Sequence, residues 1–387
     1  MTKRIFLLGA TGSIGTTTLE LLRNTPEGQF ELAGISANSN HKALLQIQSE
    51  FQVPFVHLMN PESYSIASKE AGEFQLATGM DSLLQMLKQS EVDLVLAAMV
   101  GNVGLQPVLY SLELGYTVAL ANKETLVAGG HLVAELLGED RSRLIPVDSE
   151  HSAIYQCLQG EKSETVDKLI LTASGGSFRT YCMEQLEQVQ VEDALKHPNW
   201  DMGAKITVDS SSMMNKGLEV LEAHWLFGLP FEKIEVVVHP QSIVHSMVEF
   251  QDRSVIAHLG LPDMTIPISY ALQGANRTPL PQLSSLDLVQ TGRLDFEAPD
   301  TQRFENLQLA YDAGKLGGSA PTVLNAANEV AVQAFLDHRI RFLQIPQLNR
   351  KALENHKHSS HPDLQEILEI DQKTREWTIS ELNRMQA

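Results

Sequence analysis

Two carboxylates, Asp148 and Glu150, stand two residues apart directly after the apolar run at 144–147. Residues with this spacing in extended chain point to the same side, and like charges so placed need a cation nearby. Either a Lys or Arg side chain or a divalent metal would serve. Carboxylate oxygens, with few ligands per site, suit Mg²⁺ or Mn²⁺. The alternative is an exposed acidic strand end that binds nothing.

A third carboxylate, Glu219, lies on a predicted helix, and Asn215 and Lys216 precede it by four and three residues. All three side chains therefore share one helix face. Glu219 would complete a metal site with the two carboxylates near residue 150. A surface ion pair between Lys216 and Glu219 explains the same spacing and remains the alternative.

Polar residues of the same region are suited to an anion. Ser210, at the start of the predicted helix, offers a hydroxyl and the helix N-terminal amides, but it also fits an ordinary N-cap signal. Ser174 precedes two glycines after an apolar strand, which predicts either an anion cradle or a simple turn. Lys216, Asn215 and His197 would add donors, while an ordinary surface histidine is the competing interpretation of His197.

Two further segments are placed to meet a ligand. The polar loop near 197–205 carries Trp200 and Met202, which predict either a lid that closes over a ligand or packing onto the protein body. Lys123 follows the apolar run 117–120, and a fixed ammonium there would stabilise an oxyanion. The alternative for Lys123 is a polar turn that caps a helix.

Three glycines in G-x-x-G-x-x-G spacing, Gly9, Gly12 and Gly15, follow the first predicted strand and open the first predicted helix. Glycines let the backbone turn sharply and approach a pyrophosphate, whose charge then meets the helix N-terminal amides. A dinucleotide site is therefore predicted, with an ordinary tight turn as the alternative. The end of the second strand, at 34–40, has no Asp or Glu to hold a ribose 2′-hydroxyl, which favours NADP over NAD.

The segments that position these residues alternate short apolar strands with amphipathic stretches of helix length over residues 1–150. Apolar strands separated by helices indicate a parallel sheet covered on both faces. We therefore predict an α/β fold with an N-terminal doubly wound, Rossmann-like sheet. Its predicted strands are 4–8, 30–36, 93–98, 117–120 and 144–147, and its predicted helices are 16–24, 41–51, 104–114 and 126–137.

The pattern changes after residue 150. Residues 151–273 predict a central α+β domain that carries Glu219 and the candidate anion-binding residues, residues 274–304 are linker-like, and residues 305–387 predict a C-terminal helical domain. The last two strands of the central domain are separated by three residues and are expected to form a hairpin. The predicted elements of this domain are strands 168–172, 235–238, 242–250 and 254–259 and a helix from about 211 to 227.

The composition limits the class of protein. With 387 residues, 43% of them hydrophobic, the chain forms two or three ordinary domains and is not disordered as a whole. Its formal net charge of −19 is the wrong sign for a nucleic-acid binder. No apolar run approaches the roughly 18 residues that cross a bilayer, and none resembles a signal peptide, so we expect a cytoplasmic protein without a membrane partner. Its two cysteines, Cys157 and Cys182, predict free thiols.

Taken together, these segments resemble the 1-deoxy-D-xylulose 5-phosphate reductoisomerase family over essentially the whole chain. The motifs that carry the resemblance are GATGSIG (9–15), ANKE (121–124), PVDSEH (146–151), HPNWDMG (197–203), MMNKGLE (213–219), HPQS (239–242) and LNAANE (324–329).

The resemblance implies an enzyme that rearranges 1-deoxy-D-xylulose 5-phosphate with a metal as Lewis acid, then reduces the resulting aldehyde with NADPH. The product would be 2-C-methyl-D-erythritol 4-phosphate, in the non-mevalonate isoprenoid precursor pathway. Family members are homodimers with an NADPH domain, a connective catalytic domain and a C-terminal helical bundle. They accept Mg²⁺, Mn²⁺ or Co²⁺.

The resemblance also implies roles for single residues. The implied catalytic group is Lys123 with the three metal ligands Asp148, Glu150 and Glu219. The implied substrate-binding residues are Lys123, Ser149, Glu150, Ser174, His197, Trp200, Ser210, Asn215, Lys216 and Glu219. The implied NADPH-binding residues are Thr11, Gly12, Ser13, Ile14, Asn122, Glu124 and Gly203, with Ala37, Asn38, Ser39 and Asn40 around the adenosine 2′-phosphate.

Two positions depart from the family pattern: Ser39 stands where many relatives carry a basic residue, and Ala173 replaces a common glycine. Two other functions compete with the family's reaction. An NADP-dependent semialdehyde dehydrogenase would share the glycine turn but needs a nucleophilic cysteine. A non-catalytic NADP-binding regulator would keep the fold without turnover.

Overall fold

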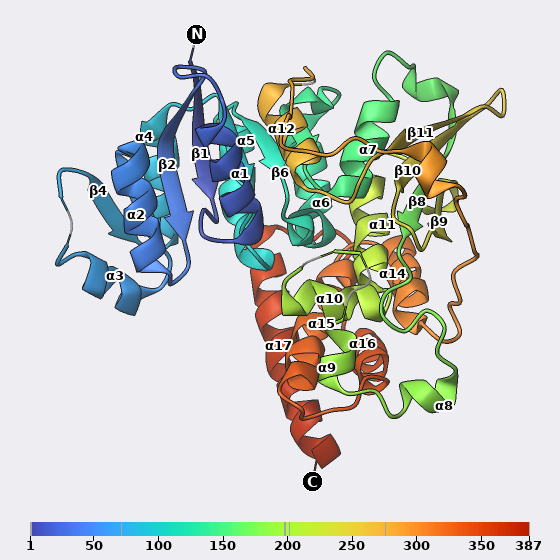
Figure 1. Cartoon of the computed structure of the whole chain (residues 1–387). Coiled ribbons are helices and arrows are strands. Elements are labelled where there is room, and N and C mark those ends of the chain that lie inside the picture. Colours follow the sequence, from blue (N-terminus) through green and yellow to red (C-terminus); the bar gives the residue numbers. More distant parts are fainter. Residues whose placement is uncertain (1, 71, 197–198, 201, 275, 387) are drawn as a thin grey trace. The chain divides into compact units, whose positions relative to one another are not determined.

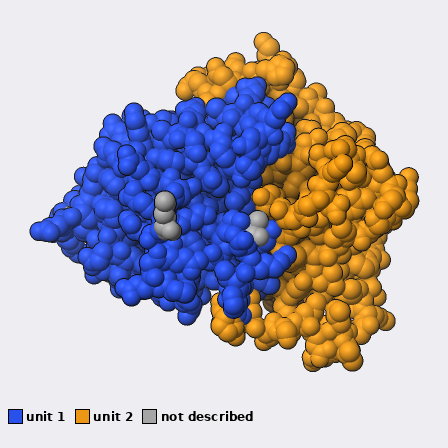
Figure 2. All heavy atoms as spheres, turned by 90° about the horizontal axis from the view of Figure 1, so that it is seen from above, with its two compact units in different colours: residues 1–125, 131–152, 263–280 blue, residues 126–130, 153–262, 281–387 orange. Residues whose placement is uncertain are grey.

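The structure is a computed structural model that describes residues 2–70, 72–196, 199–200, 202–274 and 276–386. The chain divides into two compact units, coloured blue and orange in Figure 2. Unit 1 comprises residues 1–125, 131–152 and 263–280, and unit 2 comprises residues 126–130, 153–262 and 281–387. The domain boundaries predicted at 150, 273 and 304 remain predictions.

Unit 1 is built on a seven-stranded sheet in the order β4-β3-β2-β1-β5-β6-β7, in which all neighbours are parallel (Figure 1). The chain builds outward from β1 to β4 and then returns to build from β5 to β7, which is double winding. The predicted α/β class is therefore confirmed. The strands are β1 (Lys3–Leu8), β2 (Phe30–Ala37), β3 (Phe55–Leu58), β4 (Gln75–Thr78), β5 (Leu94–Ala97), β6 (Thr117–Leu120) and β7 (Leu144–Pro146).

Helices alternate with these strands. They are α1 (Ser13–Arg23), α2 (His41–Phe51), α3 (Pro61–Ala67), α4 (Met80–Ser90), α5 (Leu105–Glu113) and α6 (Lys123–Leu137). The sequence analysis missed β3, α3, β4 and α4, because the two strands are only four residues long and β4 is not buried. Within the described part of the chain, no helix combines the length and apolar character needed to span a membrane.

One helix of unit 1 comes from much later in the chain. α12 (Thr265–Gln273) packs against α1 and β7. Lys3 Nζ donates a hydrogen bond to the Leu272 carbonyl oxygen at 2.8 Å, and burial lowers the pKa of this lysine. The sequence analysis did not predict this helix and included its residues in the central domain at 151–273, because the sequence contains no signal for so distant a contact.

Unit 2 contains a four-stranded mixed sheet in the order β11-β10-β8-β9. β8 (Val166–Ala173) is parallel to β9 (Ile234–Val238) and antiparallel to β10 (Val244–Phe250). β10 and β11 (Val255–Leu259) form the predicted antiparallel hairpin. The expectation of an α+β region is therefore confirmed.

The helix predicted from about 211 to 227 is α11 (Met214–Phe227), which begins three residues later than expected. The sequence analysis missed α10 (Ala204–Ser211), and Met213, with a φ of 61°, separates the two helices. Hydroxyl groups on consecutive serines compete for backbone carbonyls and favour such a break. The other helices are α8 (Met183–Leu186), α9 (Val191–Ala194), α13 (Leu288–Thr291), α14 (Glu305–Leu316), α15 (Ala320–Leu336), α16 (Gln344–Asn355) and α17 (Leu364–Gln386), while α7 (Ser149–Cys157) has residues in both units.

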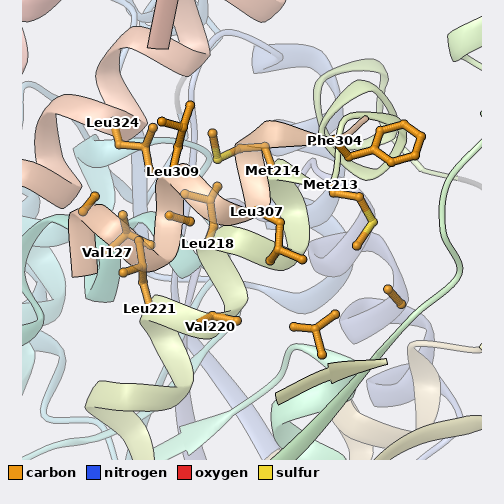
Figure 3. Packing of buried hydrophobic residues seen from close by; sticks show 14 of the residues in the cluster. Val127, Met213, Met214, Leu218, Val220, Leu221, Phe304, Leu307, Leu309 and Leu324 are labelled. Atoms are coloured by element: carbon orange, nitrogen blue, oxygen red, sulfur yellow. The ribbon is translucent and has the colours of Figure 1, made fainter. Parts of the chain in front are cut away.

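The core of unit 2 fixes α11 against the C-terminal helices. Figure 3 shows Met214, Leu218 and Leu221 of α11 among apolar side chains from α14 and α15, including Leu307 and Leu324. The two backbones of α11 and α14 approach so closely that a Cβ on Gly217 would lie 2.6 Å from the Cβ of Ala310. α11 is therefore a rigid platform for the polar residues that it also carries.

Candidate active site

The glycine turn of unit 1 joins β1 to α1, as the sequence predicts. Gly9 has a φ of +87°, and a Cβ there would lie 2.4 Å from the Ala98 carbonyl oxygen. A Cβ on Gly15 would lie 2.4 Å from the Gly9 carbonyl oxygen, so this glycine permits close contact between helix and strand. A Cβ on Gly12 would meet no heavy atom nearer than 3.5 Å. Packing therefore requires Gly9 and Gly15 but not Gly12.

The N-terminal end of α1 is suited to an anion. Gly12 is the N-cap and makes no side-chain capping bond, and the first turn contains no acidic residue. Gly12 and Ser13 are exposed, and Thr11 and Ile14 are partly exposed. The positive end of the helix dipole therefore faces solvent where a phosphate group can approach.

The segment after β2 is open as well. Ala37 ends the strand in a buried position, and Asn38, Ser39 and Asn40 after it are exposed. Asn40 caps α2 by accepting a hydrogen bond from the Ala43 amide at 3.2 Å. This segment contains no carboxylate to repel a 2′-phosphate.

The residues after β6 form a buried helix cap. Asn122, Lys123 and Glu124 are 3%, 7% and 6% exposed. The Asn122 side chain accepts a hydrogen bond from the Thr125 amide at 3.2 Å and donates to Glu124 Oε2 at 2.8 Å. It also donates to the Gly101 carbonyl oxygen at 3.1 Å. This cap fixes the start of α6, whose first residue is Lys123.

Lys123 pairs with Asp148 at the ends of two adjacent strands, β6 and β7. Lys123 Nζ lies 2.5 Å from Asp148 Oδ2, and the two side chains are 8% and 14% exposed. An ammonium group at this distance supplies part of the positive charge that neighbouring carboxylates need. The arrangement places a charge pair at the carboxyl edge of the sheet, where α/β sheets bind their ligands.

Glu150 does not lie in extended chain. β7 ends at Pro146 and α7 begins at Ser149, so Glu150 is in the first turn of a helix. A carboxylate oxygen of Asp148 and one of Glu150 still lie within 4.8 Å of each other, so the two side chains converge as expected. They converge because the chain turns into a helix between them, and not through strand spacing. Ser149 Oγ donates to Glu150 Oε2 at 2.5 Å, and the helix dipole favours an acidic residue there.

In unit 2, Glu219 of α11 is held by the two predicted partners on its own helix face. Asn215 Nδ2 donates to Glu219 Oε1 at 2.5 Å, and the Lys216 ammonium group contacts Glu219 Oε2. The Lys216 and Glu219 side chains are 4% and 1% exposed, so the alternative of a surface pair is wrong. A buried carboxylate without such partners would be strongly destabilising.

Two segments predicted to bind an anion lie together in unit 2. Gly176 has a φ of +68°, and a Cβ there would lie 2.6 Å from the Ser210 carbonyl oxygen, so the Ser174 loop rests on the Ser210 backbone. Ser174 Oγ accepts a hydrogen bond from the Gly176 amide at 3.2 Å. Ser174, Ser210 and Asn215 are all partly exposed.

Ser210 differs from its prediction in one respect. It lies in the last turn of α10 and not at the start of a helix, because the left-handed residue Met213 separates α10 from α11. The helix N-terminal amides expected beside its hydroxyl are therefore not those of its own helix.

The loop before α10 is attached to the segment that follows β9. His197 lies outside the described residues. Asn199 Nδ2 donates to the Pro240 carbonyl oxygen at 2.6 Å and to Ser242 Oγ at 2.8 Å. The sequence analysis did not assign a role to Asn199, although this residue lies in the HPNWDMG motif and its two partners lie in the HPQS motif.

The apolar residues of this loop are partly exposed. The Trp200 ring centroid lies 6.2 Å from that of His245 on β10, and Met202 is also partly exposed. Gly203 is the N-cap of α10. His245 is a neighbour that the sequence analysis missed, because a single histidine in a strand has no distinguishing spacing.

Cys157 is not a nucleophile of the kind that the competing dehydrogenase needs. Burial raises the pKa of the Cys157 thiol to about 11, so this thiol is protonated at neutral pH. Cys182 is exposed, just before α8.

A doubly wound sheet with an exposed glycine turn at one strand end, and ionisable groups at neighbouring strand ends, defines a dinucleotide-dependent oxidoreductase. Family models for 1-deoxy-D-xylulose 5-phosphate reductoisomerase match residues 5–130, and models for its C-terminal domains match residues 144–227 and 259–377. The chain belongs to the 1-deoxy-D-xylulose 5-phosphate reductoisomerase family.

Individual relatives agree over almost the full length. The 1-deoxy-D-xylulose 5-phosphate reductoisomerase of Geobacillus sp. (strain WCH70) is 53% identical over 379 residues, which cover 98% of this chain and 99% of the relative. The solved structure of the Zymomonas mobilis enzyme in complex with NADPH is 39% identical, covers 99% of both chains and has a TM-score of 0.91. A reductoisomerase structure in complex with NADPH, fosmidomycin and magnesium is 37% identical, covers 99% of both chains and has a TM-score of 0.93.

Proposed function

We propose that this chain converts 1-deoxy-D-xylulose 5-phosphate to 2-C-methyl-D-erythritol 4-phosphate with NADPH and a divalent metal, Mg²⁺ or Mn²⁺, in the non-mevalonate route to isoprenoid precursors. The observation that carries this proposal is the 53% identity, over 98% of the chain, to a relative of that name. Solved relatives in complex with NADPH and magnesium support the choice of cofactors.

NADPH would bind at the carboxyl edge of the sheet in unit 1. The proposed pyrophosphate site is the turn at Thr11, Gly12, Ser13 and Ile14, and its support is the exposed end of α1. The residues 37–40 would surround the adenosine 2′-phosphate. Asn122, Glu124 and Gly203 would contact the remainder of the cofactor.

We assign the metal to Asp148, Glu150 and Glu219. When bound, the metal would supply Lewis-acid polarisation of the substrate's ketone and hydroxyl oxygens. The donor set fits, because Mg²⁺ and Mn²⁺ prefer carboxylate oxygens. Asp148 and Glu219 each contact a lysine ammonium group in the structure. A metal bound to these carboxylates would share the charge pairing that the two lysines provide. Lys123, together with Ser149, would then contact the substrate's oxygens, and Lys216 would contact its phosphate.

The phosphate group would be held by Ser174, Ser210, Asn215 and Lys216, with His197 nearby. The contact between the Ser174 loop and the Ser210 backbone supports a shared site for these serines. A phosphate held in this way provides binding energy away from the reacting carbons, which can align the substrate. Trp200 and Met202 would close over the bound molecule.

We also propose that the enzyme is a cytoplasmic homodimer. β11 is an edge strand of the mixed sheet, and Val255, Ile256 and Leu259 on it are 49%, 38% and 37% exposed. Apolar side chains on an open edge strand favour pairing with a second copy. Light scattering should give twice the mass of one chain, and Val255→Lys should reduce it to a single chain if β11 forms the interface.

The function is tested by following NADPH absorbance after 1-deoxy-D-xylulose 5-phosphate is added, with Mg²⁺ or Mn²⁺ and then with a chelator. We expect metal-dependent loss of NADPH, and parallel reactions with NADH would measure how Ser39 affects cofactor choice. A folded protein that binds NADPH but shows no turnover would instead support the non-catalytic regulator.

A further inference from the structure

A row of buried polar side chains connects α10 to three helices of the C-terminal region in unit 2. Asp209 Oδ1 on α10 accepts a hydrogen bond from Asn328 Nδ2 on α15 at 2.7 Å. Asn349 Nδ2 on α16 donates to Asn328 Oδ1 at 3.1 Å and to Asn306 Oδ1 on α14 at 3.0 Å. Asp209, Asn306, Asn328 and Asn349 are each no more than 1% exposed.

The carboxylate of Asp209 sets the direction of every hydrogen bond in this row. An ionised carboxylate only accepts, so Asn328 must present its NH₂ group to Asp209 and its oxygen to Asn349. Asn349 must then donate. Lys205 Nζ lies 3.0 Å from the other carboxylate oxygen, Asp209 Oδ2, and keeps the charge paired. One charge on α10 therefore determines how amides on three other helices, α15, α16 and α14, are oriented.

The position of α10 depends on this row because the helix is short and has no side-chain cap at its N-terminus. It is eight residues long, its N-cap Gly203 makes no side-chain capping bond, and it ends at the break before α11. Helices this short are marginal without tertiary contacts. Ser211 adds a polar anchor, since its hydroxyl lies 3.3 Å from the Ala194 carbonyl oxygen and 3.2 Å from Ser177 Oγ.

We propose that Asn328, supported by Asn349, is a positioning residue for sugar-phosphate binding. It holds Asp209, and through the backbone of α10 this positions the adjoining Ser210, whose hydroxyl is assigned to the phosphate group. This inference rests on the proposed role of Ser210. It assigns a task to the LNAANE segment, which none of the proposed ligand contacts includes.

The test compares two asparagines of α15. Asn328→Ala leaves Asp209 without its amide donor and should raise the KM for 1-deoxy-D-xylulose 5-phosphate about tenfold, with the KM for NADPH changed by less than about twofold. Asn325→Ala is the matched control, because Asn325 is 1% exposed on the same helix but donates to Glu329 Oε1 at 3.1 Å. It should lower thermal stability without raising the KM for the sugar phosphate.

An exchange of the two side chains separates positioning from general stability. Asn328→Asp alone places a second carboxylate next to Asp209. The repulsion between the two should impair both folding and sugar-phosphate binding. In the double variant Asp209→Asn and Asn328→Asp, the new amide can donate to the new carboxylate while Asn349 still donates to it. We expect the KM for the sugar phosphate to return to within about threefold of the parent value.

The outcomes distinguish this inference from the function on which it rests. An equal KM change in Asn328→Ala and Asn325→Ala would overturn the inference, as would a double variant that regains thermal stability but not affinity for the sugar phosphate. If Asn328→Ala does not fold, the double variant and Asn349→Ala are compared in its place. Ser210→Ala with an unchanged KM would instead remove Ser210 from the phosphate site itself.

Discussion

The glycine turn of unit 1 is assigned to the pyrophosphate of the cofactor, and the polar face of α11 in unit 2 is assigned to the metal and the substrate's phosphate. The first site is formed by backbone groups and the second by charged side chains. The turn offers exposed backbone around Gly12, with no acidic side chain in the first helical turn. The face of α11 offers Lys216 and Glu219, which are 4% and 1% exposed. An exposed backbone site needs only the right chain path, whereas a buried ionic site also needs every charge to be paired.

The largest effect should come from the buried ionic site. Glu219→Gln removes one proposed metal ligand and leaves Lys216 without its carboxylate partner. We expect turnover to fall by at least about 10²-fold, because it removes a group that supports charge in the reaction, while NADPH affinity stays within about twofold. Steady-state assays and a fluorescence titration with NADPH measure the two quantities. Near-normal turnover would reject Glu219 as a ligand.

Substitutions at two glycines of the turn in unit 1 should distinguish a role in folding from a role in cofactor binding. Gly15→Ala places a Cβ 2.4 Å from the Gly9 carbonyl oxygen and should cost about 1–3 kcal/mol of unfolding free energy. A Cβ at residue 12 meets nothing nearer than 3.5 Å, so Gly12→Ala should leave thermal stability unchanged. The same Cβ would obstruct the close approach of the backbone to the pyrophosphate, so NADPH binding should weaken about tenfold. Unchanged NADPH affinity in Gly12→Ala would contradict the proposed pyrophosphate site.

A smaller effect is expected from the loop before α10. Trp200 is partly exposed, so Trp200→Ala should raise the KM for the sugar phosphate several-fold with little change in melting temperature. Steady-state kinetics and thermal unfolding test this together. A large fall in melting temperature would support the alternative in which Trp200 only packs onto the protein body.

The smallest effect concerns the two thiols. At pH 8, a thiol reagent should modify the exposed Cys182 and spare Cys157, whose buried thiol has a pKa of about 11. Mass spectrometry identifies the labelled residue, and turnover of the labelled enzyme should be unchanged. Loss of turnover that tracks labelling of Cys157 would revive a mechanism with a cysteine nucleophile.

Local patterns were sufficient for the features that depend on neighbouring residues. The glycine turn between β1 and α1 and the shared face of Asn215, Lys216 and Glu219 follow from strand and helix periodicity alone. The burial of Lys216 and Glu219 could not be predicted in this way, because it depends on helices that pack from elsewhere in the chain. The residue roles themselves came from the family resemblance.

Other features depend on where elements end, which periodicity does not determine. Glu150 lies in the first turn of a helix and not at the end of a strand. Because of the break at Met213, Ser210 lies in the last turn of α10 and not at the start of a helix. The association of α12 with α1 joins segments more than 200 positions apart, and it has no local signal. These misses share one cause, since each is decided by tertiary contacts.

The central claim is that one active site both rearranges the sugar phosphate and reduces it with NADPH. The most direct measurement uses NADPH carrying deuterium at the transferable position and analyses the product by NMR and mass spectrometry, with Mg²⁺ and with chelator. We predict 2-C-methyl-D-erythritol 4-phosphate with one deuterium on the carbon of the reduced aldehyde, formed only with metal. An unrearranged, reduced sugar phosphate, or NADPH oxidation without deuterium in the product, would contradict the claim.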